Sequence, residues 1–136
     1  MKKVHFVGIG GIGLSALAKY LKQEGYEITG SDVKATKITA GLEEMGISVR
    51  IPHDPDCITD QDLVVFSAVI KPDNIELVRA REKGMSIMPR REALLFILKN
   101  RRVFSVCGAH GKSTTSAMLA SLIEGSLVIG AESKQY

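Results

Sequence analysis

Two glycine-rich turns, each placed where an apolar strand should pass into a helix, constrain this chain more than any other feature. The first turn is GIGGIG at 8–13, which follows the short apolar run 4–7. The second is GAHGKST at 108–114, which follows the run 103–107. Glycine lets the backbone curl close to an anion, and the free N–H groups that open the next helix point toward that anion. Two such turns of different type predict two phosphate-bearing ligands and a reaction that joins their chemistry.

Short β-rich runs alternate with amphipathic helical runs over the first hundred residues, and glycines mark the returns. The expected strands are 4–7, 26–30, 48–51, 63–67 and 85–88. The expected helices are 11–24, a stretch around 38–45, a stretch from 73 to 84, and 90–100. Strand–helix alternation with short links predicts a parallel sheet with right-handed crossovers. We therefore expect residues 1–100 to form an α/β domain of the Rossmann-like, doubly wound type.

Local signals refine this expectation at several element ends. Gly25 follows the first helical run at the position where a left-handed residue is preferred. Asp73 and Glu76 have the spacing of a capping box that opens the third helix. The run 63–67 is apolar throughout its first four residues, which is typical of a strand buried on both faces of a parallel sheet.

The last part of the chain predicts a second, incomplete unit. Runs 102–107 and 127–130 read as strands on either side of a helix at 112–123. A single βαβ unit of about 30 residues cannot cover both faces of its own sheet. We therefore expect residues 101–136 to be the truncated start of a P-loop ATPase-type domain in a longer protein. Residues after about 125 are expected to be mobile or held by a neighbouring chain, because their sheet partners are absent.

The first turn carries the G-x-G-x-x-G pattern. Gly8, Gly10 and Gly13 supply its glycines, and Asp32 follows 19 residues after the last of them, where an acid can accept a ribose hydroxyl. This pattern predicts a nucleotide diphosphate, but NAD and a UDP-sugar both present a diphosphate between two sugars. Tight packing of helix on strand also selects glycine, and Asp32 also suits a solvated loop. An NAD-binding oxidoreductase or sensor module therefore stays open as an alternative.

The second turn is a shortened relative of the G-x-x-x-x-G-K-[ST] loop, since Val106 stands where the first glycine would fall. The groups needed for a nucleoside triphosphate are nevertheless present. Lys112 can neutralise charge on the β- and γ-phosphates, and Ser113 can bind Mg²⁺ through its hydroxyl. His110 contributes either a side-chain donor or only its backbone. The turn predicts ATP or GTP as its ligand.

Composition and charge exclude several other classes of protein. The formal net charge is +3 and aromatic residues make up 5% of the chain, so no basic, aromatic stripe for nucleic acid is present. The longest apolar run, 93–98, is too short to cross a bilayer. Residues 1–18 imitate a secretory signal, but glycines and His5 interrupt its apolar part. Cys57 and Cys107 form neither a metal-binding spacing nor a disulfide framework, which suits the cytoplasm, and Cys107 reads as a small apolar filler of a buried strand.

Taken together, the two turns and the runs between them resemble the Mur ligases of bacterial cell-wall synthesis. The matching runs are HFVGIGGIGLS at 5–15, GSD at 30–32, SAVIK at 67–71 with Asn74, and GAHGKSTT at 108–115. This combination, in this order, covers essentially the whole chain. The departures are Leu14 for methionine, Ala109 for threonine and Ser113 for threonine, and the last of these keeps its hydroxyl.

The resemblance implies UDP-N-acetylmuramate on the first domain and ATP with Mg²⁺ on the second. The residues that it implies for the UDP-sugar are Gly8, Gly10, Gly11, Ile12, Gly13, Asp32, His53, Ser67 and Ala68. The residues that it implies for ATP are Gly108, Ala109, His110, Gly111, Lys112, Ser113 and Thr114. Within this set Lys112 is the catalytic residue and Ser113 the metal ligand. Further metal-binding acids and an amino-acid-binding domain are expected beyond residue 136.

The resemblance also implies a reaction. The γ-phosphoryl group of ATP passes to the lactyl carboxylate of the sugar, and the amine of an amino acid attacks the acyl phosphate. The first turn favours the branch of the family that adds L-alanine, because the branch that recycles murein tripeptide carries bulkier residues there. We expect the chain alone not to complete this reaction. A non-catalytic module that only binds a UDP-sugar is a third interpretation.

Overall fold

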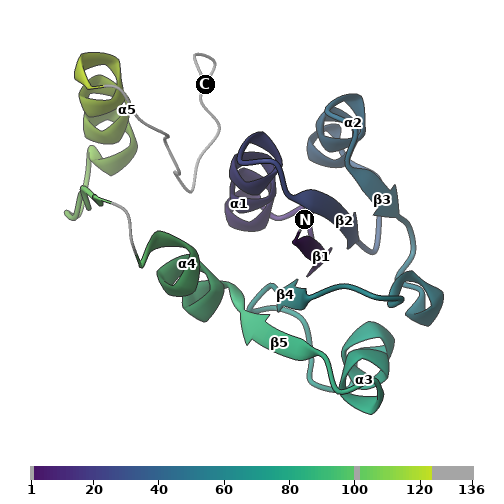
Figure 1. Cartoon of the computed structure of the whole chain (residues 1–136). Coiled ribbons are helices and arrows are strands. Elements are labelled where there is room, and N and C mark those ends of the chain that lie inside the picture. The colour runs from purple at the N-terminus through teal and green to yellow at the C-terminus, as the bar shows by residue number, and fades with distance from the viewer. Residues whose placement is uncertain (1, 100–101, 124–136) are drawn as a thin grey trace.

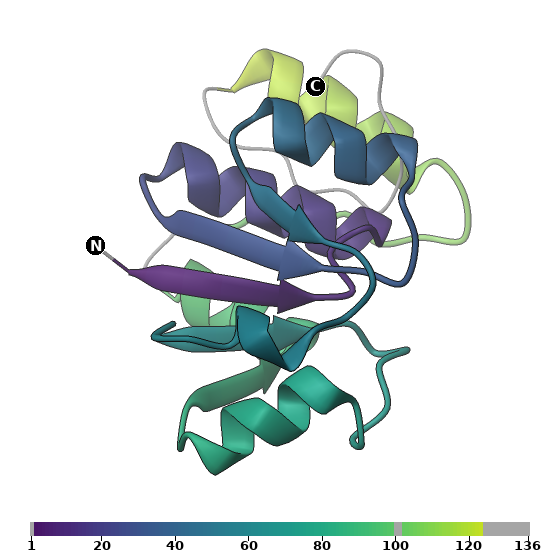
Figure 2. The same cartoon turned by 90° about the vertical axis from the view of Figure 1, so that its right-hand side faces the viewer.

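The computed structural model describes residues 2–99 and 102–123. The expected strand at 127–130 and the expected behaviour of the chain after residue 125 lie outside these residues. The described part contains a five-stranded sheet, six helical segments and the links between them (Figures 1 and 2).

All five strands of the sheet are parallel, in the order β3-β2-β1-β4-β5. They are β1 (Lys3–Val7), β2 (Glu27–Ser31), β3 (Ser48–Arg50), β4 (Leu63–Phe66) and β5 (Ser86–Pro89). The chain runs outward from β1 to β3, returns to the other side of β1, and then runs outward again to β5. This order confirms the doubly wound α/β fold. The strand order therefore reverses between β1 and β4, and ligands of such sheets bind in the crevice at the carboxyl ends of the strands there.

Helices cover the two faces of the sheet unequally. The α-helices are α1 (Ile12–Gln23), α2 (Lys37–Glu44), α3 (Ile75–Glu82), α4 (Arg90–Leu98) and α5 (Lys112–Leu122), and a short 3₁₀ helix, η1, spans Pro55–Cys57. Figure 1 shows α1 and α2 on one side of the sheet and α3 on the other. Residues of α1, α2 and α4 share the larger apolar core, whereas α3 packs over a smaller one beneath β4 and β5.

The side chains of β1 alternate between these two cores. Val4 and Phe6 join the larger core and Val7 joins the smaller one, so the strand is buried on both faces. His5 shares the face of Val7 but is a buried polar residue. Because β1 lies at the centre of the sheet, a polar side chain at this position needs hydrogen-bonding partners on the neighbouring elements.

The N-terminus of α3 differs from the predicted capping box. The cap is Asn74, whose side-chain oxygen accepts a hydrogen bond from the backbone N–H of Glu76 at 2.9 Å. Asp73 makes no such contact, and the Glu76 carboxylate is fully buried rather than folded back on the helix start. The prediction was wrong because Glu76 has stronger partners inside the fold, where two histidines, a serine hydroxyl and a backbone amide surround its carboxylate.

Residues 102–107 do not form the predicted strand, and Cys107 is exposed rather than buried. A strand is stable only when a neighbour completes its hydrogen bonds, and no described residue pairs with this run. The helix that follows begins at Lys112 as expected, but none of its residues is buried. Among the helices of the described residues, none has the length and apolar character needed to cross a membrane.

Candidate nucleotide-binding site

The first glycine turn lies at the carboxyl end of β1, at the point where the strand order reverses. Gly8 has a φ of +83°, and the backbone amides of Gly8 and Ile9 both donate to the carbonyl oxygen of Ser31, at 2.9 and 3.0 Å. The turn is therefore fastened to the end of β2. Helix α1 begins directly afterwards, with Gly11 as its N-cap and no side chain closing that end. The first backbone amides of α1 are thus available to an anion at the crevice.

Asp32 lies against this turn, as its position after β2 predicts. One of its carboxylate oxygens accepts the backbone N–H of Gly10 at 2.7 Å, and the other accepts that of Val33 at the same distance. A Cβ on Gly10 would lie 2.7 Å from the first of these oxygens, so a side chain there would displace the Asp32 carboxylate. Asp32 therefore braces the turn, and an ionised carboxylate retains further lone pairs for a ribose hydroxyl. That second role stays a prediction.

Ser67 also reaches the turn. Its backbone N–H donates to the carbonyl oxygen of Val7 at 3.1 Å, and its Cβ would lie 3.2 Å from a Cβ on Gly8. The neighbouring Ala68 is exposed. Residues that follow β1, β2 and β4 therefore meet at one edge of the sheet, and a UDP-sugar at this edge stays a prediction.

Arg90 is a neighbour of the turn that the sequence patterns did not single out. It is the first residue of α4, and its guanidinium lies over Gly13 so closely that a Cβ there would be 2.6 Å from Cζ. No glycine motif includes a residue so distant in sequence. The chain alternation predicts only that the end of β5 lies at the same sheet edge as the end of β1.

His53 lies in the segment after β3 and is held at the end of β2 by a buried polar network. Its Nδ1 lies 2.8 Å from the Ser31 hydroxyl oxygen, and that hydroxyl donates to the carboxylate of Glu76 at 2.6 Å. The other Glu76 oxygen accepts the backbone N–H of Asp54 at 2.8 Å. His5 completes the group, with Nε2 3.1 Å from Glu76 and Nδ1 2.8 Å from the Thr29 hydroxyl. The network joins β1, β2, α3 and the segment after β3.

Glu76 is ionised in this network. Burial raises the pKa of its carboxyl, but hydrogen bonds from His5, from Ser31 and from the backbone of Asp54 offset that effect and leave the pKa below its ordinary value. A carboxylate only accepts hydrogen bonds, so Nε2 of His5 carries a proton. Because the Ser31 hydroxyl proton is used by Glu76, Nδ1 of His53 donates to the Ser31 oxygen. His53 therefore presents its other ring nitrogen away from the network.

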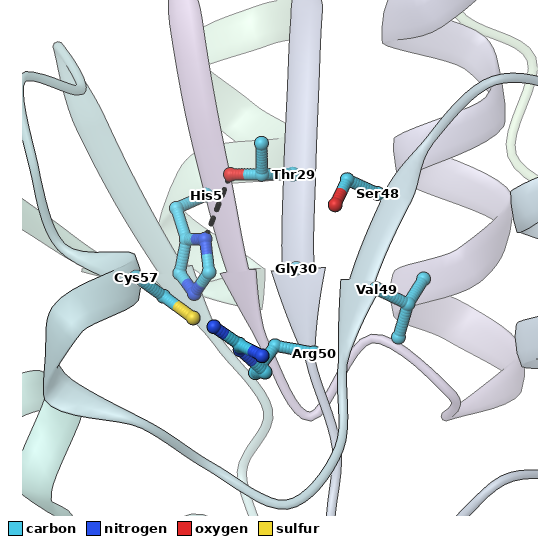
Figure 3. A pocket seen from close by; sticks show the side chains of 7 residues that line it. All are labelled: His5, Thr29, Gly30, Ser48, Val49, Arg50 and Cys57. Atoms are coloured by element: carbon cyan, nitrogen blue, oxygen red, sulfur yellow. Dashed lines mark hydrogen bonds between the residues drawn. The ribbon is translucent and has the colours of Figure 1, made fainter.

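A pocket of about 360 Å³ opens over β2 and β3, on the same face of the sheet as α3 but beyond the area that α3 covers. It is lined by His5, Thr29, Gly30, Ser48, Val49, Arg50 and Cys57 (Figure 3). Burial is the main cause that raises the pKa of the Cys57 thiol, so this thiol is protonated at neutral pH. None of the predicted site residues lines this pocket. The pocket and the glycine turn are thus different places on the domain.

The second glycine turn is compact and exposed. Gly108 and Gly111 have φ of +156° and +77°, and α5 begins immediately after them. The ammonium group of Lys112 donates to the carbonyl oxygen of Gly108 at 2.7 Å and lies 3.4 Å from that of Ala109. The lysine is therefore folded over its own turn, with the exposed side chains of Ser113 and Thr114 beside it on the first turn of α5. His110 is exposed as well.

Metal binding by acidic and histidine clusters is not supported in the described residues. They contain no group of three or more His, Cys, Asp or Glu side chains that could hold a metal ion. A magnesium ion that travels with a nucleotide needs only one or two protein ligands, because phosphates and water supply the rest. The Ser113 hydroxyl at the start of α5 fits that requirement.

Fold and turns together define a doubly wound α/β protein with a glycine turn at its topological switch point, followed by a glycine–lysine turn. The model of the Mur ligase family, catalytic domain, matches residues 3–102. The chain belongs to the Mur ligase family, and the resemblance seen in the sequence is confirmed.

Individual ligases of known structure or sequence are similar to this chain. The chain is 60% identical to a UDP-N-acetylmuramate–L-alanine ligase of Campylobacter curvus over 136 residues, all of this chain and 31% of that relative. The crystal structure of UDP-N-acetylmuramate–alanine ligase from Thermotoga maritima matches with a TM-score of 0.82 at 41% identity, covering 88% of this chain and 28% of that one. A UDP-N-acetylmuramate:L-alanyl-γ-D-glutamyl-meso-diaminopimelate ligase from Neisseria meningitides gives 0.79 at 31% identity, over 88% and 38%. The chain therefore spans about a third of the length of these relatives.

Proposed function

We propose that this chain is the front part of an ATP-dependent ligase that joins L-alanine to the lactyl carboxylate of UDP-N-acetylmuramate. The observation that carries the proposal is the 60% identity to an L-alanine ligase across every residue of the chain. The two glycine turns supply the physical basis, because each offers backbone amides and a helix N-terminus to a phosphate-bearing ligand. Residues 1–100 form the UDP-sugar domain in this proposal, and residues 101–136 begin the ATP domain.

The first turn would hold the diphosphate of the UDP-sugar. The backbone amides of Ile12 and Gly13 at the start of α1, where the strand order reverses, would donate to it, whereas the amide of Gly11 already donates to the carbonyl oxygen of Gly8 at 3.3 Å. Asp32 and Ser67 flank the turn on its two sides, next to the end of β2 and of β4. The nucleoside would extend from there toward Ala68 and His53.

The second turn would hold ATP. Binding of the triphosphate would draw the ammonium of Lys112 from the carbonyl of Gly108 to the β- and γ-phosphates, where its charge is better satisfied. The Ser113 hydroxyl is the group that this turn offers to Mg²⁺, and a bound Mg²⁺ would neutralise charge on the transferred phosphoryl group. The N-terminus of α5 adds partial positive charge at the same place.

The proposed chemistry has two steps. A lactyl carboxylate oxygen attacks the γ-phosphorus of ATP, so that an acyl phosphate forms and ADP leaves. The amine of L-alanine then attacks the acyl carbon, phosphate leaves, and the amine loses a proton as the amide forms. The contribution of Lys112 is to steady the phosphoryl group in line with its acceptor and to balance its developing charge.

A ligase acting on murein tripeptide is a second candidate within the family. The Neisseria structure, whose name includes the tripeptide L-alanyl-γ-D-glutamyl-meso-diaminopimelate, matches with a TM-score of 0.79, close to the 0.82 of the Thermotoga structure. Sequence identity separates the two, because this chain is 31% identical to the Neisseria protein and 41% identical to the Thermotoga protein. The small first turn of this chain also favours L-alanine.

A cytoplasmic location belongs to the same proposal, because Cys57 and Cys107 are free thiols, as a reducing compartment maintains them.

Replacing the turn lysine tests the proposal. In the full-length protein, Lys112→Ala should lower L-alanine-dependent ADP release by about a hundredfold or more, since phosphoryl transfer depends on charge stabilisation at the γ-phosphate. UDP-N-acetylmuramate should still bind with its normal affinity. Lys99→Ala, which removes another exposed lysine, serves as the matched control and should leave turnover unchanged. Unchanged turnover in Lys112→Ala would remove Lys112 from the ATP site. Absence of L-alanine-dependent ADP release from the unmodified full-length protein would refute the ligase and leave a redox, sensor or binding module.

A further inference from the structure

Arg90 is placed at the first glycine turn by the fold rather than by any motif. Strand β5 ends at Pro89 and α4 begins at Arg90, so the side chain starts from the same sheet edge as the turn. Its guanidinium reaches across to the first turn of α1. A Cβ on Gly13 would lie 2.6 Å from both Cζ and Nε of Arg90 and 2.8 Å from one terminal nitrogen. Cation and helix start are therefore in direct contact.

Gly13 and Arg90 fit together because the first has no side chain. Any other residue at position 13 would displace the guanidinium, at distances that real Cβ contacts do not show. Gly41, in the middle of α2, has nothing within 4 Å of the same hypothetical atom. The glycine of the turn thus does more than permit a tight helix start, since it makes room for a cation.

The guanidinium of Arg90 is partly buried but has no anionic partner among the described residues. Within residues 2–99 and 102–123, no carboxylate forms an ion pair with it and no acceptor hydrogen-bonds to it. Its five N–H donors therefore remain available to an incoming acceptor. It lies beside the backbone amides of a helix start, a second group of donors that also lack acceptors. Two sets of donors without acceptors among the described residues therefore lie side by side.

We propose that Arg90 binds the diphosphate of the nucleotide ligand, as the cation that the glycine turn itself lacks. The inference rests on the proposed function, because it assigns a residue to the same UDP-sugar site. The turn at 8–13 contains no lysine or arginine, so the free backbone amides at the start of α1 are the only other donors that it offers to two phosphates. A guanidinium offers a planar pair of N–H donors that matches two phosphate oxygens, and it stays charged at every physiological pH.

Calorimetric titration of this chain with UDP and with uridine tests the inference. UDP carries the diphosphate and uridine does not, so a phosphate contact affects only the first ligand. Arg90→Met should weaken UDP binding by about tenfold or more, the effect expected for one lost charge-assisted hydrogen bond, and leave uridine binding unchanged. Arg90→Lys keeps the charge but loses the planar pair of donors. Its affinity for UDP should fall between those of the unmodified chain and Arg90→Met.

Arg91 provides a matched control, because it is the next residue of α4 and is exposed. Arg91→Met makes the same change in charge and should bind UDP and uridine as the unmodified chain does. If Arg90→Met fails to fold, judged by its melting curve, Arg90→Lys carries the same comparison.

Three outcomes would overturn the inference. Unchanged UDP binding in Arg90→Met would remove Arg90 from the site and leave the proposed function standing. Equal weakening for UDP and uridine would show that Arg90 acts through packing. Failure of the unmodified chain to bind UDP at all would defeat both the inference and the UDP-sugar proposal.

Discussion

At the scale of single residues, Gly30 and Gly41 predict opposite effects of the same substitution. A Cβ on Gly30 would lie 2.5 Å from Cδ1 of Ile9 and 2.9 Å from the carbonyl oxygen of Phe6. Gly30→Ala should therefore cost about 2 kcal/mol of unfolding free energy, as overpacked core positions do. Gly41 lies inside α2 with open space around it, so Gly41→Ala should stabilise the chain by about 0.5–1 kcal/mol. Urea unfolding of both variants measures the difference, and equal effects would contradict the packing described at Gly30.

Sequence patterns located the glycines and Asp32 because those residues are defined by local spacing along the chain. They did not locate Arg90, or the role of Glu76, since both depend on contacts between distant segments. The Asp73–Glu76 spacing was interpreted as a helix cap for the same reason, because a short-range pattern was the only information available about Glu76. In the structure its partners lie on β1, β2 and the segment after β3.

At the scale of elements, the Glu76 network predicts how stability depends on pH. The folded-state pKa of Glu76 lies below its ordinary value of 4.5, so the ionised carboxylate stabilises the fold above that pH. This contribution is lost as the pH falls from about 4.5 through the lower folded-state value. Glu76→Gln should cost about 3 kcal/mol at pH 7, since a neutral amide cannot accept all the hydrogen bonds that the buried carboxylate receives from His5, Ser31 and the backbone of Asp54.

Urea unfolding at pH 7 and at pH 4 separates this contribution from general acid effects. The unmodified chain should lose more stability between the two pH values than Glu76→Gln, which lacks the titrating carboxyl. A matched control is Glu82→Gln, at the exposed end of α3. If the unmodified chain and Glu76→Gln lost the same amount, the network would not be the stabilising feature that its geometry indicates.

Most elements of the first domain follow from hydrophobic alternation and glycine punctuation, and their ends shift by only one or two residues. The exception is the run 102–107, where β-rich composition predicted a strand that the described structure lacks. Composition records what a side chain prefers on a sheet, whereas a strand also requires a neighbour to pair with. The first five strands have such neighbours in one sheet.

At the scale of the whole molecule, the structure predicts that the first domain folds independently of the second turn. Helix α5 has no buried residue, whereas the two apolar cores lie entirely within residues 4–97. A chain that ends at Lys99 should therefore unfold at the same urea concentration as the whole chain, to within the error of the measurement. A loss of more than about 1 kcal/mol on truncation would contradict the proposed boundary near residue 100.

The central claim is that the first glycine turn receives a sugar nucleotide rather than a dinucleotide cofactor. Calorimetric titration of the chain with UDP-N-acetylmuramate and, separately, with NADH tests it most directly. We expect saturable binding of UDP-N-acetylmuramate with one site per chain and no measurable heat from NADH. Tight binding of NADH without binding of UDP-N-acetylmuramate would contradict it.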